Sequence, residues 1–120
     1  MTLPPHIPGQ NARPPEGSIP TGVNEGKRLF AKGYFWEAHE AWEPVWMDLE
    51  EDSAERALVQ GMIQIANARL KLVMGRAKAA ARIAEIAERH LSDAGSLDGA
   101  DWARREMESL MADVGKKGAV

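Results

Sequence analysis

Residues 57–75, ALVQGMIQIANARLKLVMG, constrain the fold more than any other part of the chain. At about 100° per residue, the apolar side chains of this segment cover roughly two thirds of a helix circumference. These side chains are Leu58, Val59, Met62, Ile63, Ile65, Ala66, Leu70, Leu72 and Val73. A helix on the surface of a globular protein shows a narrower apolar stripe. We therefore expect a central helix that other elements contact on several sides.

The remaining face of this helix carries a polar strip, which consists of Arg56, Gln60, Gln64, Asn67 and Lys71. The strip is either open to solvent or covered by a neighbouring element. If it is covered, its amides need hydrogen-bond partners, because unpaired buried polar groups are costly. The sequence leaves both alternatives open.

The fold class predicted for the whole chain is all-α, because no segment alternates apolar and polar residues as a β-strand does. We expect a single compact multihelical bundle of about five helices, over residues 23–32, 35–50, 52–75, 76–91 and 100–114. Asp52 and Glu55 resemble a capping box at the start of the third helix. Short connections between the helices favour antiparallel hairpins.

An N-terminal arm precedes the bundle, since residues 1–22 hold six of the seven prolines. Proline fixes φ and lacks an N–H group, so this arm is extended or turn-like. It is either a flexible leader or a segment anchored across the bundle by Leu3, Ile7 and Ile19. The bundle domain then takes residues 23–115, and residues 116–120 form a tail that we expect to fray.

Bulk composition excludes several classes of protein. A chain of 120 residues suffices for one domain, and the absence of cysteine excludes disulfides, thiol catalysis and thiolate zinc sites. A net charge of −3 with mixed signs argues against sequence-independent nucleic-acid binding. No apolar run reaches the roughly 20 residues that cross a bilayer, and no signal peptide is evident. We expect a soluble cytoplasmic protein that binds neither nucleic acid nor membrane.

The expected second helix contains the densest group of polar and aromatic residues. Residues 33–46, GYFWEAHEAWEPVW, hold one histidine, three glutamates and three tryptophans. On a helical wheel, Trp42 and Trp46 lie on the core side and His39 lies at its border. Since His39 and Glu43 are four residues apart, they share a face and can touch. Glu37 and Glu40 lie further round the helix, where we expect them to be solvated.

This group does not complete a known catalytic or metal motif. The string HEAWE differs from the zinc-protease pattern H-E-x-x-H because Glu43 stands at the second histidine position. A di-iron site needs a glutamate three residues before its histidine, and that position is Trp36. The chain also lacks the nucleophile elbow G-x-S-x-G and the glycine patterns of phosphate loops. We therefore predict no metal and no cofactor.

Pro44 lies inside the second helix, where it cannot donate a hydrogen bond to the carbonyl of Glu40. Pro44 is expected either to kink the helix or to break it into two pieces, and a kink would open a shallow pocket between the His39 and Trp46 segments. Alternatively, Pro44 merely bends the helix around the core.

Two segments of the sequence resemble the signature of the protein family called domain of unknown function 309. The resemblance rests on the segment from Phe35 to Glu40, on Trp46, and on the run Gln60, Gly61, Met62, Ile63, Gln64. It covers about residues 23–91, and Pro44 is a departure from the pattern. The resemblance implies a compact helical bundle without an established activity. It singles out the following positions for testing: Glu37, His39, Glu40, Glu43, Trp46, Gln60, Gly61 and Gln64.

Two hypotheses for the function remain. The first is a non-enzymatic helical binding or interaction module, because tryptophans anchor interfaces and packed helices offer grooves. Its candidate binding cluster is Glu37, His39, Glu40, Glu43, Trp46, Gln60 and Gln64, and its partner is a protein, a small molecule or a second copy in a homodimer. The second hypothesis is a small metal-binding protein or enzyme. In it His39 is the ligand or base, oriented by Glu43 or Glu40, and Gln60 and Gln64 face it across a pocket.

Overall fold

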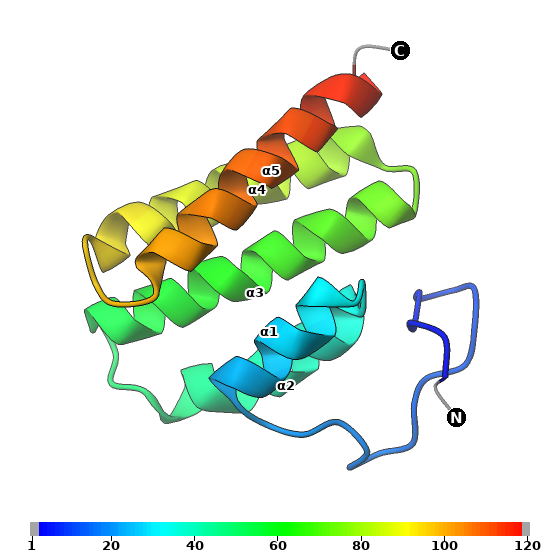
Figure 1. The fold of residues 1–120 in the computed structure, drawn as a ribbon, viewed down its shortest axis with the longest axis horizontal. Coiled ribbons are helices and arrows are strands. Elements are labelled where there is room, and N and C mark those ends of the chain that lie inside the picture. Colours follow the sequence, from blue (N-terminus) through cyan, green and yellow to red (C-terminus); the bar gives the residue numbers. More distant parts are fainter. Residues whose placement is uncertain (1–2, 119–120) are drawn as a thin grey trace.

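The computed structural model describes residues 3–118, with side chains described as far as Lys116. Five helices follow one another and run antiparallel to their neighbours (Figure 1): α1 Val23–Ala31, α2 Phe35–Asp48, α3 Ala54–Val73, α4 Ala77–Ala94 and α5 Ala100–Gly118. Residues 3–118 contain no strand. The predicted all-α multihelical bundle is confirmed.

Helix α3 lies at the centre of the bundle. The pair α1 and α2 lies on one side of it and the pair α4 and α5 on the other (Figure 1), and α3 contacts α2, α4 and α5. Met62 and Ile65 of α3 are fully buried. The expectation of a central helix contacted on several sides is confirmed. All five residues of its polar strip are half-buried, so the strip is neither open nor fully covered.

An aromatic cluster joins α1, α2 and α5. The Trp42 side chain has no exposed surface, and its ring lies 6.1 Å from Phe30 and 6.0 Å from Trp102 between centroids. Its indole Nε1 donates a hydrogen bond to the Val23 carbonyl at 3.0 Å. Gly26 on α1 lies directly against the indole, because a Cβ atom there would overlap it. The close approach of α1 to α2 therefore depends on a residue without a side chain.

A second glycine allows α3 to approach α4. A Cβ atom on Gly61 would lie 2.7 Å from Cδ2 of Leu91, and the carbonyl of Ala87 is also close. In this structure the glycine between the two glutamines of α3 therefore has a packing role rather than a role in a site.

Three helix ends differ from the sequence-based expectation. Helix α3 is capped by Ser53, whose hydroxyl accepts the N–H of Arg56 at 3.1 Å. Asp52, the expected cap, instead has a φ of 62° in the preceding turn. Helix α4 continues past Leu91 to Ala94, because Ala94 is buried and extends the apolar face. Helix α5 continues to Gly118, three residues into the expected tail, and residues 119–120 lie outside the described part.

Pro44 does not break its helix. Helix α2 is continuous from Phe35 to Asp48. The Pro44 side chain is exposed, so its ring faces away from the core. The alternative of two shorter helices separated at Pro44 is wrong.

Candidate functional site

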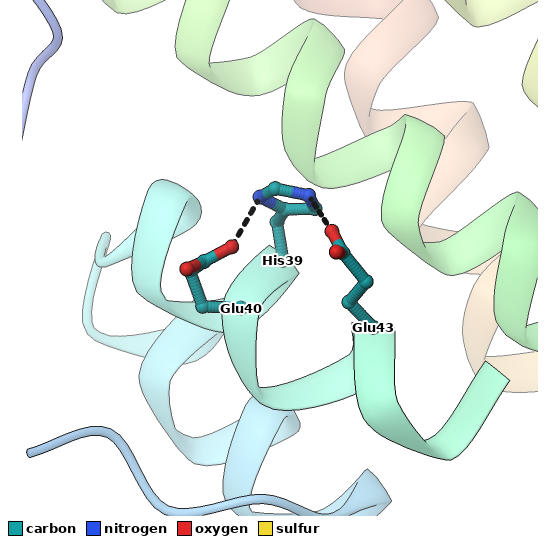
Figure 2. Close-up of side chains that lie close together, drawn as sticks. All are labelled: His39, Glu40 and Glu43. Carbon is teal, nitrogen blue, oxygen red and sulfur yellow. Dashed lines mark ion pairs between the residues drawn. The ribbon is translucent and has the colours of Figure 1, made fainter. Parts of the chain in front are cut away.

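His39 lies between two carboxylates of its own helix. Its Nε2 lies 2.8 Å from Oε2 of Glu43, and its Nδ1 lies 3.5 Å from Oε2 of Glu40, at opposite ends of the ring (Figure 2). The side chain of His39 is 21% exposed. The predicted contact between His39 and Glu43 is confirmed. At 3.5 Å the Nδ1 atom makes no hydrogen bond with Glu40, although it is buried.

Glu37 is buried, and the expectation that it is solvated is wrong. Only 5% of its surface is exposed. Its Oε2 accepts the backbone N–H of His6 at 2.9 Å, and its Oε1 has no hydrogen-bond partner. The physical reason is that the N-terminal arm covers this side of α2, which a helical wheel of α2 alone cannot show.

Hydrogen bonds within the arm fix the shape of residues 5–11, which lie beside α2. The Asn11 amide donates to the Pro5 carbonyl, and its Oδ1 accepts the Ile7 N–H, each at 2.9 Å. The same Oδ1 lies 3.0 Å from Nδ1 of His6, so this ring nitrogen is the donor. The ring of His6 meets Trp36 edge to face at a centroid distance of 4.6 Å.

The burial of His6 is a feature that the sequence does not reveal. His6 is 6% exposed, whereas the expected anchor Leu3 is 51% exposed. The Leu3 carbonyl nevertheless accepts a hydrogen bond from the Tyr34 hydroxyl. A single histidine among prolines carries no periodic signal, so its contact with Trp36 appears only in the folded chain.

Trp46 lies further along α2, where it contacts the start of α3. The Arg56 guanidinium lies 4.3 Å from the centre of the Trp46 ring, and Arg56 Nε donates to the Trp46 carbonyl at 3.3 Å. The indole Nε1 of Trp46 is buried without a hydrogen-bond partner.

Of the two glutamines in the predicted cluster, Gln64 contacts a residue of α3 itself and Gln60 faces α4. Oε1 of Gln64 accepts the Asn67 side-chain amide at 3.4 Å. Gln60 lines a polar hollow of about 460 Å³ together with Arg56, His90 and Asp93. Among the residues that the structure describes, neither glutamine makes a hydrogen bond to His39. The structure thus brings together His39, Glu40 and Glu43, and it places Gln60 in a separate hollow.

A groove of about 550 Å³ lies between residues 13–21 of the arm and helix α2. Trp36, Glu40 and Pro44 form its α2 wall. The arm wall consists of Arg13, Pro14, Pro15, Glu16, Gly17, Ile19 and Thr21. Glu40 therefore belongs both to this groove and to the surroundings of His39.

Among the described residues, the buried side-chain nitrogen and oxygen atoms that lack a hydrogen bond all lie on α2. Within the described part of the chain they are Oε1 of Glu37, Nδ1 of His39 and Nε1 of Trp46. A buried polar atom without a partner costs about 1–3 kcal/mol, and native proteins contain few of them. A helix that carries all three is not arranged for greatest stability.

The His39 group also offers the elements of a cation site. One donor atom from each of His39, Glu40 and Glu43 can be chosen so that all three lie within 4.8 Å of one another. Imidazole and carboxylate together suit Zn²⁺ or Mn²⁺. In the observed rotamers Glu40 and Glu43 lie at opposite ends of the ring, so a shared ion would require one of them to turn.

The fold and this site define a class of small helical bundles with a His/Glu/Trp edge on the second helix. Residues 23–83 match the family model described as domain of unknown function (DUF309). The match covers more than half of the chain and includes α1, α2 and α3, so the protein belongs to this family. Comparisons with curated proteins and with solved structures gave no match. No described helix is long and apolar enough to cross a membrane.

Proposed function

We propose that this protein is a non-enzymatic binding module whose site is the polar edge of α2. The polar edge is defined as Glu37, His39, Glu40, Glu43 and Trp46. The observation that carries the proposal is the concentration on this helix of buried polar atoms without partners. Such atoms lower stability, and proteins retain them where a ligand, an ion or a partner completes their hydrogen bonds.

The geometry favours binding over catalysis. To act as a general base, His39 would need one ring nitrogen within hydrogen-bond reach of the substrate proton that it removes. Both ring nitrogens of His39 already face carboxylates, at 2.8 Å and 3.5 Å. A substrate would have to displace Glu40 or Glu43 before it reached the imidazole. The groove beside Glu40 has a volume in the range of small-molecule sites, which is about 300–1,000 Å³.

The occupant of the module is a small molecule or a segment of a protein. A homodimer and a cytoplasmic location stay predictions.

A ligand screen tests the proposal. We expect members of a library of metabolites and short peptides to raise the melting temperature of the wild-type protein, and we expect Glu40→Gln to reduce the rise. Glu55→Gln is the matched control, since Glu55 is an exposed glutamate in the first turn of α3. Ligands that shift the wild type and Glu40→Gln equally would contradict a site on the polar edge.

A metal-binding protein is the second candidate, and the proximity of the donor atoms of His39, Glu40 and Glu43 favours it. If the candidate is correct, protein purified without chelator binds close to one equivalent of zinc or manganese. His39→Ala is expected to lose the ion, and His90→Ala, which leaves the group intact, is expected to keep it. Mass spectrometry of bound metals measures both. Equal metal content in wild type and His39→Ala would exclude this group as the site.

A further inference from the structure

The face of Trp36 already holds a guanidinium group. The guanidinium carbon of Arg13 lies 5.5 Å from the centre of the Trp36 ring. Cations over an indole face are attracted by the ring quadrupole within about 6 Å. The arm therefore presents one of its own side chains to the ring, beside the groove that both residues line.

Two carboxylates face this groove, and among the described residues no arginine or lysine forms an ion pair with either of them. Glu16 comes from the arm wall and Glu40 from the α2 wall. Among the described residues, neither Glu16 nor Glu40 forms an ion pair with Arg13. The neighbour of Glu40 is Nδ1 of His39 at 3.5 Å, which is too long for a good hydrogen bond. The acids of the groove outnumber its bases by two to one.

The remaining wall consists of Gly17, Thr21 and a group of apolar residues rich in proline. Pro14, Pro15, Ile19 and Pro44 line the groove beside Trp36. Proline walls hold their shape because φ is fixed. Such a wall suits the aliphatic stem that connects a guanidinium group to the rest of a molecule.

We propose that the groove between the arm and α2 binds a ligand that carries a guanidinium group, and that Arg13 occupies part of this site in the free protein. The ligand's planar cation lies on Trp36, its N–H groups donate to the carboxylates of Glu16 and Glu40, and its stem lies along the prolines. This inference rests on the proposed function, because Glu40 belongs to the polar edge. The guanidinium comes either from a small molecule or from an arginine side chain in a peptide.

Two probes distinguish these sources. The first is n-butylguanidinium, which carries a single positive charge. The second is the capped peptide Ac-Gly-Arg-Gly-NH₂, in which the arginine side chain is likewise the only charged group. Isothermal titration at low salt measures their affinity, and tryptophan emission follows the same titration. Binding of both probes with similar affinity shows that the guanidinium and its stem suffice. Binding of the peptide alone shows that the groove takes an arginine within a chain.

Single substitutions measure how much each groove residue contributes to the affinity for these probes. Arg13→Ala removes the internal occupant, so it is expected to tighten binding by about two- to fivefold, which is the effect of one exposed cation–π contact. Glu40→Gln is expected to weaken binding by about tenfold, the loss of one charge-assisted hydrogen bond. Glu55→Gln keeps the wild-type affinity. Trp36→Leu is expected to weaken binding by about two- to fivefold, the loss of the ligand's own cation–π contact, and circular dichroism establishes that this variant folds.

Three results would overturn the inference. One is the absence of binding of both probes to wild type and to Arg13→Ala. Another is loss of binding in Arg13→Ala together with binding of a dicarboxylate such as succinate, because Arg13 would then be an anion ligand. The third is equal affinity in Glu40→Gln and wild type. The proposed function fails separately, when the library ligands shift the melting temperature of wild type and Glu40→Gln equally.

Discussion

Gly26→Ala is expected to lower the free energy of unfolding by roughly 3 kcal/mol, at the upper end of the cost of overpacking a core. The new Cβ atom would overlap the indole of Trp42. Because Trp42 is fully buried and its Nε1 is bonded to Val23, the ring cannot move away without losing that bond. Urea denaturation followed by tryptophan emission measures the change.

The matched control is Gly115→Ala in α5, where nothing lies within 4 Å of the new atom. This substitution is expected to raise stability by up to about 1 kcal/mol, since alanine favours a helix over glycine by that amount. If the free energy of unfolding of Gly26→Ala were within about 1 kcal/mol of the wild-type value, the substitution would not overpack the core, because overpacking costs about 1–3 kcal/mol. The described approach of α1 to Trp42 would then be wrong.

Glu37→Leu is expected to release the N-terminal arm from α2. The substitution removes the acceptor of the His6 N–H, and a hydrogen bond to a charged group contributes about 1.5–3 kcal/mol. Amide hydrogen exchange at His6 and Ile7 should therefore become about 10- to 100-fold faster. The stability of the bundle itself is expected to change little, because the arm lies outside its core.

Glu37→Gln is the control for this prediction. Glutamine keeps an oxygen acceptor at the same place, so exchange at His6 is expected to rise by less than in Glu37→Leu. Unchanged exchange in Glu37→Leu would mean that the arm is held by its other contacts, such as the Tyr34 hydroxyl on the Leu3 carbonyl.

The helices could be predicted from the sequence because their signals are local. The apolar periodicity of α3 predicts its central position without knowledge of its neighbours. The pair of His39 and Glu43 was predictable for the same reason, since a spacing of four residues is enough to bring two side chains together. Helix ends were less predictable. Ser53 displaced Asp52 as the cap, and burial of Ala94 extended α4.

The environment of the site could not be predicted, because it depends on contacts between distant segments. Glu37 appears solvated on a wheel of α2, yet it is buried because His6, 31 residues earlier, lies against it. Gln60 and Gln64 share a face of α3, but Gln64 bonds Asn67 on α3 itself, whereas Gln60 lines a hollow that His90 and Asp93 of α4 complete. The groove beside Trp36 likewise exists only after the arm has folded back on α2.

We propose that the polar edge of α2 serves binding rather than stability. The most direct test is the free energy of unfolding of His39→Leu relative to wild type. The partly exposed pair of His39 and Glu43 contributes about 0–1 kcal/mol to the free energy of unfolding. The buried Nδ1 of His39, which has no hydrogen-bond partner, costs about 1–3 kcal/mol. If the polar edge serves binding, we expect His39→Leu to be as stable as the wild type or more stable. A loss of more than about 2 kcal/mol, beyond what a partly exposed ion pair can supply, would contradict it and make His39 a structural residue.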